Sequence, residues 1–445
     1  MNQVKSFMLL FMFMKARFKF RILIFMCALG TELSVCAQRN YTLDECIQSA
    51  LDHNVRMKKA RNEVRMAEYD RKEVQSRYLP DISAFGTGFI ADQGLAQMEL
   101  TPKLRMSMMK DGVIGGVMAT APLFTGGQII NGDKLAKLGV ESKRLQENLS
   151  GNEVRLQTEQ YFWQVVSLKE KLNTLDAVER QLSQLQQDMD LSVQAGVVTR
   201  NDLLQVQLRR NEVLSNRLNL ENLLSLSRRM LAQYIGCVTD SFDIAFHIDD
   251  RQPEAPDSLF CDHAQVLSAT DEFVLLQKNL KASDLQYKMS VGNNLPKIVL
   301  GGGYLYDNLT DKDHPYWVGL ATVSIPISGW IGGSQHIKKM KLQVRNAEDQ
   351  LVDQSQLLVL RMQNAWNALN NAYKQIGIAR LTIEQAEENL RMNKDLYSAG
   401  TCTMTDLLEA QTLYQQGRDK YVEAFTEYEI KKREYLQATG RGTCN

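Results

Sequence analysis

The sequence has little proline, few aromatic residues and no excess of charge of either sign. Proline accounts for 8 of the 445 residues and aromatic residues for 8%, whereas Gln, Asn and Leu recur through long stretches. This composition favours extended helices over a compact sheet core. Lys plus Arg and Asp plus Glu number 52 each, so the chain lacks the basic surplus expected of a nucleic-acid-binding protein.

Residues that build catalytic and metal sites are also sparse. The five histidines show no metal-ligand spacing, and the chain has neither a Gly-rich phosphate loop after a buried strand nor a Ser/His/Asp or Cys/His arrangement. We therefore expect a protein that is not an enzyme and that binds no cofactor and no metal. The histidines are His53, His247, His263, His314 and His336.

Cysteines are few and irregularly spaced, and an odd number of them follows residue 37. This pattern implies no disulfide framework. A single Cys237–Cys261 bridge and unpaired buried thiols both remain open. The five cysteines after residue 37 are Cys46, Cys237, Cys261, Cys402 and Cys444.

The N-terminus is typical of a secretory signal peptide. Four basic residues between positions 15 and 21 precede the apolar run "ILIFMCALG", and a small-residue site ends at Ala37. The apolar run is too short to span a bilayer as a helix. We predict a signal peptide over residues 1–37; a start at Met14 and a lipidated Cys36 remain alternatives. Its removal takes away five Lys/Arg and one Glu, leaving an excess of four acidic residues.

The rest of the chain contains one pattern twice. The segment "SVQAGVVTRNDLL", ending at Leu204, has a counterpart in "LYSAGTCTMTDLL", ending at Leu408. "APLFTGG" and "LAQYIG" have counterparts at the same offset of 204 residues. The Leu-Pro pairs that begin at positions 79 and 295 are offset by 216, so about twelve residues differ in the loop between the next two strands. A constant offset indicates a tandem repeat.

Each repeat reads as helix, strand, strand, long helix, turn, helix. The 67-residue run 128–194 contains no proline and would extend on the order of 100 Å as a helix. Two shorter helices stacked end to end match that length, which predicts a long helical wall. We expect helices over 42–78, 128–194, 202–236 and 334–398, and strands over 81–90, 112–124, 297–306 and 316–327.

The last helix carries a heptad stripe that we expect to lie inside this wall. Tyrosines recur every seven residues beside a parallel stripe of small residues, and such spacing keeps one seam facing a partner helix. The two stripes are Leu407, Tyr414, Tyr421, Tyr428 and Tyr435, and Ala410, Gly417 and Ala424.

The Gly-rich strands have the length of transmembrane β-strands. Apolar residues alternate along two of them, and aromatic residues suit the membrane interfaces. A soluble β-subdomain that caps the helices is the alternative, and export favours the membrane. Four strands in lipid would leave two open edges, so copies must close the sheet into 8, 12 or 16 strands. The residues are Val113, Val117, Ala119 and Ala121, then Trp317, Ala321, Val323 and Ile325, with Tyr304, Tyr306 and Tyr316.

The ordered motifs resemble the TolC-type outer membrane efflux protein family. They are "YTLDECIQSAL", "YLP", "APLFTGG", "AG…NDLL" and, in the second copy, "AG…TDLLEAQ". The resemblance implies a mainly α trimer, in which a 12-stranded outer-membrane barrel with four strands per chain continues into a long periplasmic α-helical barrel. It also implies a passive exit duct that works with a periplasmic adaptor and an inner-membrane pump of the RND or ABC type.

The resemblance places the two Ala-Gly turns at a periplasmic tip that docks the adaptor, namely Ala195, Gly196, Ala399 and Gly400. It implies that Asp406 and Glu409 form a ring of carboxylates at the narrowest point of the duct. Asp202, beside Asn201, matches a residue that locks the two hairpins together. The alternative role for Asp202 and Asp406 is capping of the helix N-termini.

One position departs from the family pattern. The arginine expected in the second turn is replaced by Cys402, which cannot make a charge-assisted bond to Asp202. Our hypothesis is that Arg200 in the first turn contributes to closure instead.

The predicted organisation is a signal peptide over 1–37, a first repeat over 38–240 and a connection over 241–262. A second repeat over 263–440 and a tail over 441–445 complete it. A periplasmic coiled-coil adaptor is the alternative function, although adaptors carry one hairpin and this chain carries two.

Overall fold

The fold is described from a computed structural model, which covers most of the chain after residue 39. The predicted signal peptide, with Met14 and Cys36, and Cys444 lie outside the described residues. The described residues are 40–92, 96–101, 104–108, 111–237, 242–246, 248, 253–309, 313–327 and 329–442.

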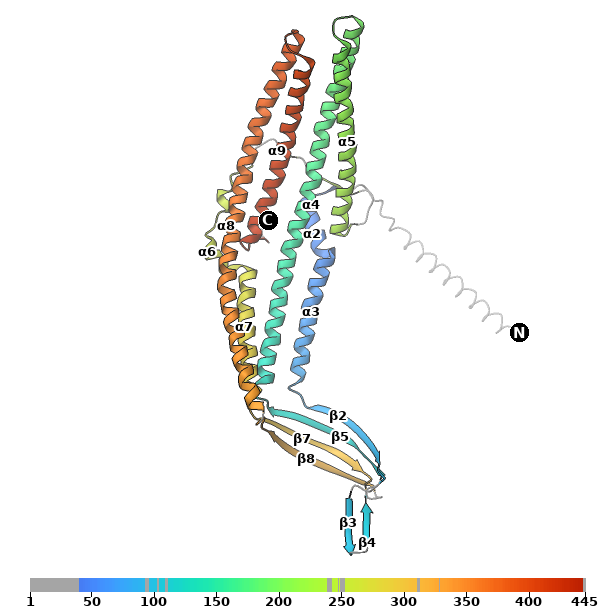
Figure 1. The fold of residues 1–445 in the computed structure, drawn as a ribbon, viewed down its shortest axis with the longest axis vertical. Helices are drawn as coiled ribbons and strands as arrows, with labels where there is room; N and C mark the ends of the chain where they lie inside the picture. Colours follow the sequence, from blue (N-terminus) through green and yellow to red (C-terminus); the bar gives the residue numbers. More distant parts are fainter. Residues whose placement is uncertain are drawn as a thin grey trace, which may run out of the picture.

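The molecule is an elongated wall of helices with a β-sheet at one end (Figure 1). The helices are α2 (Leu43–His53), α3 (Val55–Ser76), α4 (Gln128–Gln194), α5 (Arg200–Ile235), α6 (His263–Val266), α7 (Asp271–Gly292), α8 (Gly329–Ser398) and α9 (Met404–Ala438). The strands are β1 (Asn40–Tyr41), β2 (Asp81–Ile90), β3 (Ala96–Thr101), β4 (Leu104–Met108), β5 (Asp111–Phe124), β6 (Asp243–Ile244), β7 (Lys297–Asp307) and β8 (His314–Ser324). Two short 3₁₀ helices, η1 (Pro256–Leu259) and η2 (Leu267–Ala269), precede α7.

The two long helices α4 and α8 run through the whole wall, and shorter helices flank them in two tiers. In the tier next to the sheet, α3 packs on α4, α4 on α7 and α7 on α8. In the other tier, α5 packs on α4, α4 on α9 and α9 on α8. The predicted stacking of two short helices against one long helix is therefore confirmed.

The tandem repeat is visible in the helix boundaries. Helices α3 and α7 each contain 22 residues, and both of their ends differ by 216. Helices α5 and α9 begin 204 residues apart, and α4 and α8 end 204 residues apart. The extra residues of the first repeat include the β3–β4 hairpin between β2 and β5.

One predicted helix is wrong in detail. Residues 42–78 do not form a single helix, because the backbone becomes extended at Asn54, between α2 and α3. The Asn54 side chain accepts a hydrogen bond from the Arg56 N–H at 2.8 Å and donates one to the Tyr234 carbonyl at 2.9 Å. The break is thus fixed by a contact with a residue 180 positions away.

The main core lies where the two tiers meet. Three of the four heptad tyrosines of α9 are buried there, with Tyr421 2%, Tyr428 3% and Tyr435 0% exposed, whereas Tyr414 is half-buried. Trp366 packs on Tyr435 with ring centroids 5.1 Å apart. This aromatic core anchors the hairpins at their base, so their far ends project beyond it (Figure 1).

The main sheet contains four antiparallel strands in the order β2-β5-β7-β8. The predicted alternation is partial: Val117, Trp317 and Val323 are exposed, Ala119 and Ala121 are half-buried, and Ile325 lies just after β8. Tyr304 pairs with Trp317 across β7 and β8, and their rings lie 5.2 Å apart. In the described part of the chain, β2 and β8 each have one strand neighbour, so both edges of the sheet are open.

No helix of the described segments is both long enough and apolar enough to span a membrane. Cys237 and Cys261 do not form a bridge. The Cys237 sulfur lies 3.5 Å from the Tyr41 hydroxyl, and the Cys261 sulfur lies 3.4 Å from the Tyr435 hydroxyl.

Candidate functional site at the hairpin tips

The two repeated turns lie together at the end of the molecule away from the sheet (Figure 1). Helix α4 ends at Gln194 and helix α8 ends at Ser398. After each helix, an Ala-Gly pair reverses the direction of the chain. Gly196 has φ +71° and Gly400 φ +74°, values that L-residues with side chains rarely adopt. A Cβ on either glycine would meet no atom within 4 Å, so backbone conformation, and not space, selects glycine.

The backbone closes both turns in the same way. After Ala195, the Val197 N–H donates to the Ser192 carbonyl at 2.9 Å. After Ala399, the Thr401 N–H donates to the Leu396 carbonyl at 3.0 Å. These are the bonds of a Schellman motif, which satisfies the last carbonyls of each long helix.

Both returning helices begin with a capping box. The Thr199 hydroxyl donates to Asp202 Oδ2 at 2.7 Å, and the Asp202 N–H donates back to Thr199 Oγ1 at 3.2 Å. The Thr403 hydroxyl donates to Asp406 Oδ2 at 2.6 Å, and the Asp406 N–H donates to Thr403 Oγ1 at 3.2 Å. In each case threonine is the N-cap and aspartate the third helical residue. The hydrogen bonds from Thr403 lower the pKa of Asp406, so its carboxylate stays charged.

The remaining residues predicted at the tip differ in their contacts. Asn201, Glu409 and Arg200 are exposed, and no ion pair of Arg200 occurs among the described residues. The Cys402 thiol donates to the Asn393 carbonyl of its own hairpin at 3.4 Å. Cys402 therefore turns back on α8 and does not reach the first hairpin.

Tyr397 is a residue of the tip that sequence reasoning missed. Its hydroxyl donates to Met189 Sδ at 3.3 Å, and this contact joins α8 to α4. Burial raises the pKa of Tyr397, and the nearby charge of Asp202 raises it further. Tyr397 thus brings the second hairpin close to Asp202. The sequence feature that could have indicated Tyr397 is its position, three residues before the turn glycine Gly400.

Neutral amides join the two hairpins below the turns. The Thr405 hydroxyl donates to Gln205 Oε1 at 3.2 Å, which links α9 to α5. The Gln411 amide donates to Gln181 Oε1 at 3.2 Å, which links α9 to α4. Arg209 donates to Gln415 Oε1 at 3.0 Å, again between α5 and α9. We call these three hydrogen bonds the amide latch.

An apolar cluster supports the tips from within. Its side chains come from α4, α5 and α9, so the two hairpins share one core. The buried members are Leu175, Val178, Leu182, Met189, Val206, Val213, Met404, Leu407 and Leu408.

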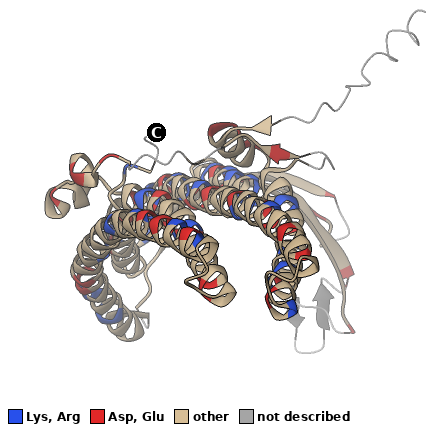
Figure 2. Cartoon of the chain, turned by 90° about the horizontal axis from the view of Figure 1, so that it is seen from above, with Lys and Arg blue, Asp and Glu red and all other residues tan. Residues whose placement is uncertain are grey.

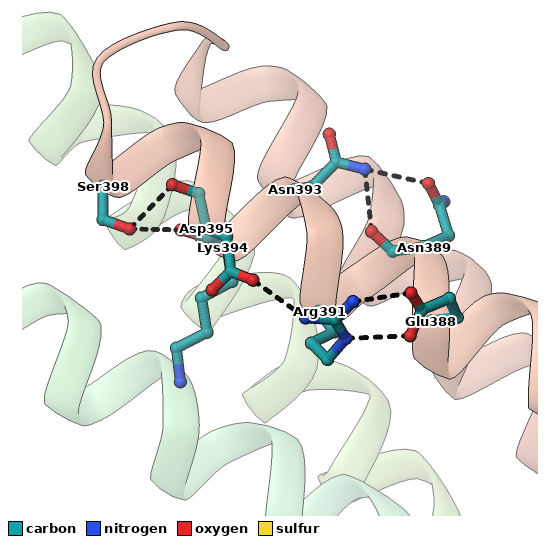
Figure 3. Close-up of polar contacts among 7 residues, drawn as sticks. All are labelled: Glu388, Asn389, Arg391, Asn393, Lys394, Asp395 and Ser398. Atoms are coloured by element: carbon teal, nitrogen blue, oxygen red, sulfur yellow. Dashed lines mark hydrogen bonds and ion pairs between the residues drawn. The ribbon is translucent and has the colours of Figure 1, made fainter.

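The last turns of α8 carry an exposed ion-pair network (Figure 3). Two nitrogens of the Arg391 guanidinium donate to the carboxylate oxygens of Glu388 at 2.7 and 2.8 Å, and a third donates to Asp395 at 3.1 Å. Lys394 points away from this network in the same view. Exposed pairs contribute little stability, so the network mainly orders the surface of α8.

The described residues contain no group of three or more His, Cys, Asp or Glu side chains that could hold a metal ion. The tips are two turns with capped helix starts, and hydrogen bonds to glutamine side-chain oxygens join the two hairpins below them. Figure 2, seen from above, shows acidic and basic residues interspersed over the helices around them. The described part of the chain therefore has two capped hairpin tips at one end of the helical wall and a sheet with two open edges at the other.

The chain belongs to the outer membrane efflux protein family, whose model matches residues 46–237 and 265–441. Proteins of this family are outer-membrane channels with a periplasmic tunnel and are not enzymes. The chain is accordingly an outer-membrane efflux channel, and the predicted family, class and location are confirmed. A search of curated proteins gives no significant match.

Solved structures share this fold at low sequence identity. A membrane protein from Pseudomonas aeruginosa is 14% identical, with a TM-score of 0.77 and 90% of each chain covered. The outer membrane channel CmeC from Campylobacter jejuni is 15% identical, with a TM-score of 0.76, and the match covers 90% of this chain and 86% of CmeC. The open state of the MtrE outer membrane channel from Neisseria gonorrhoeae is 15% identical, with a TM-score of 0.71, covering 90% and 89%.

Proposed function

We propose that the chain is the exit duct of a tripartite efflux or type I secretion system. Substrates pass through it from a periplasmic adaptor and an inner-membrane RND or ABC-type pump to the exterior. The duct is passive, and the pump supplies the energy. The observation that carries this proposal is a membrane-length sheet with open edges at one end of a helical wall and two capped hairpin tips at the other.

The functional unit that we propose is a homotrimer. An unpaired strand edge costs several kcal/mol per backbone group in lipid, so β2 of one copy must pair with β8 of the next. Three copies give 12 strands, the number implied by the resemblance. Outer-membrane lipid then surrounds the exposed apolar side chains of the strands.

We also propose that Asp406 and Glu409 line the narrowest point of the duct. Three copies would bring six carboxylates together, and close like charges attract multivalent cations. Asn201 and Asp202 lie in the first turn of helix α5, and Cys402 lies in the turn that precedes α9. Arg200 would act on a neighbouring copy, because it has no ion-pair partner in the described part of its own chain.

Cation block of the channel tests this constriction. Substituting Asp406→Ala together with Glu409→Ala should weaken block by multivalent cations in planar bilayers at least tenfold. Glu387→Ala is the matched control: Glu387 is exposed on α8, about 18 Å from the turn by helical rise. Unchanged block in the double variant would remove both carboxylates from the constriction.

The Ala-Gly turns are proposed to dock the adaptor. Gly400→Val, or Gly196→Val, forces an unfavourable φ into one turn without touching a neighbour. We expect loss of the complex with the periplasmic adaptor, while the trimer persists. Full assembly and export by both variants would argue against docking at the tips.

A further inference from the structure

Two cysteines that are far apart in the sequence lie together where the two tiers of the wall meet. Cys46 lies on α2, and Cys237 directly follows Gly236, the C-cap of α5. Cys46 is 0% exposed and belongs to the main core, whereas Cys237 is half-buried and packs against the same core. Helix α2 and the base of α5 are neighbours (Figure 1). Neither thiol has a part in the proposed duct.

One face of α2 lies against the end of α5. Cys46, Ser49 and His53 share this face, because residues three or four positions apart lie side by side on a helix. The Ser49 hydroxyl donates to the Ile235 carbonyl at 2.9 Å. A Cβ added to Gly236 would lie 2.5 Å from the His53 Cβ. The residues just before the second cysteine therefore contact the stripe of α2 that carries the first.

The Cys237 sulfur also contacts the start of α2. It lies 3.5 Å from the hydroxyl of Tyr41, the residue that precedes the N-cap Thr42. The Thr42 carbonyl accepts a hydrogen bond from the Cys46 N–H at 3.0 Å. Along α2, Cys46 thus lies between the residue that contacts the Cys237 sulfur and the residues that contact the end of α5.

The electrostatics of Cys46 agree with this placement. Burial raises the pKa of the Cys46 thiol to about 12, and the charges of Glu45 and Cys237 contribute to the same shift. The Coulomb energy falls with distance, so a charge at Cys237 acts on Cys46 because the two side chains are near each other. The two thiols are therefore neighbours in the folded chain.

We propose that a disulfide joins Cys46 and Cys237 in the exported protein. The periplasm, where the tunnel of this channel family lies, is an oxidising compartment in which disulfides form and persist. Each thiol loses one proton and one electron, and one sulfur–sulfur bond forms. The two electrons and two protons pass to the disulfide of a periplasmic thiol oxidase, which becomes a dithiol.

The burial of Cys46 sets the order of the steps. Cys237 is the more accessible thiol, so its thiolate attacks the disulfide of the oxidase and forms a mixed disulfide. The Cys46 thiolate then attacks the Cys237 sulfur and releases the oxidase as a dithiol. A thiol with a pKa of about 12 forms little thiolate, so this second attack must precede the docking of α2 in the core. The bond therefore forms during folding.

The bond would hold a short helix in place. Helix α2 contains 11 residues, and the strand β1 before it contains two. The loop that the disulfide closes includes α3, α4 and α5, and a cross-link across so long a loop restricts the unfolded chain strongly. Two other described cysteines have different surroundings: Cys261 contacts Tyr435 of α9, and Cys402 lies at the tips.

Peptide mapping of the unaltered, full-length protein tests the bond. Cells are quenched with acid, and thiols are blocked with N-ethylmaleimide under denaturing conditions before purification, so that oxidation by air does not contribute. Trypsin releases Cys46 in the peptide 40–56, Cys237 in 230–251 and Cys261 in 252–278. We expect most of the protein to yield 40–56 linked to 230–251, with a mass two hydrogen atoms below their sum, and a reductant should separate them.

Recovery of both peptides as separate maleimide adducts would overturn the proposal, and so would a link from 230–251 to 252–278. Either result leaves the proposed function standing. Cys402→Ala is the matched control and should leave the linked species unchanged.

Equilibrium unfolding with and without reductant is the second measurement. Reductant should lower the denaturant midpoint of the wild type and leave that of the double variant Cys46→Ala with Cys237→Ala unchanged. A wild-type midpoint that does not respond to reductant contradicts the stabilising role of the bond.

Discussion

A buried ion pair between the two repeats should make stability depend on pH. Glu159 of α4 is 3% exposed, and its Oε1 atom lies 2.5 Å from Nε of Arg433 on α9. Burial raises the pKa of Glu159 from 4.5 to about 7, although Arg433 opposes the shift. Of the other charges nearby, Glu429 raises this pKa and Lys432 lowers it.

The sign of the effect follows from linkage. A carboxyl group whose pKa is higher in the folded state stabilises the fold below the unfolded pKa and loses that contribution as pH rises. The window for Glu159 therefore runs from about pH 4.5 to about pH 7. The difference between these two pKa values corresponds to about 3 kcal/mol, the largest change this group can contribute.

The substitution Glu159→Gln removes the titration and keeps the shape of the side chain. We expect the difference in unfolding free energy between wild type and Glu159→Gln to change by up to about 3 kcal/mol between pH 4.5 and 8, in favour of the variant at high pH. Denaturant unfolding followed by circular dichroism at 222 nm, at one protein concentration, measures it. Glu153→Gln is the control, since Glu153 pairs with Arg56 on the exposed surface of α4. A pH-independent difference for Glu159→Gln would refute the reasoning.

Three further substitutions test the tip and the C-terminal anchor. Thr403→Ala removes the N-cap of α9 and should lower the free energy of unfolding in denaturant by about 1 kcal/mol. Thr403→Ser keeps the capping hydroxyl and should retain most of the wild-type stability. Gly400→Ala should destabilise by about 1 kcal/mol through its positive φ, whereas Gly139→Ala, in open space within α4, should not destabilise. Arg441→Ala removes a hydrogen bond to a main-chain carbonyl and a contact over the Tyr435 ring, and faster proteolysis of the C-terminus should report the loss.

Much of the architecture could be predicted because strong local signals coincide with element boundaries. The proline-free run 128–194 has the same first and last residues as helix α4. The strands that begin at residues 81 and 297 follow directly after prolines. The repeat added a second constraint on the element boundaries, because a boundary placed wrongly in one repeat would disagree with the equivalent boundary in the other. Fold class and family followed from the order of these elements.

The parts that could not be predicted depend on contacts distant in sequence. The break at Asn54 needs the carbonyl of Tyr234, which local spacing cannot reveal. Every bond of the amide latch accepts on a glutamine, and the sequence alone would place each glutamine on a solvated helix surface. Only the packing of α9 against α4 and α5 brings the glutamines to their partners. Tyr397 was overlooked for the same reason, since its partner Met189 belongs to the other repeat.

The two turns have the same backbone geometry, but the contacts that join one hairpin to the other have a separate physical origin. Gly196 and Gly400 supply the same positive φ, and Thr199 and Thr403 cap the returning helices in the same way, so each turn is determined by its own backbone. We propose that closure in this chain depends on how one hairpin holds the other. Where the resemblance implies an arginine, Cys402 bonds to its own hairpin, and the three hydrogen bonds of the amide latch accept on neutral amide oxygens. Salt screens pairs of opposite charge far more than hydrogen bonds to neutral acceptors, so a duct closed by this latch should resist opening by ionic strength.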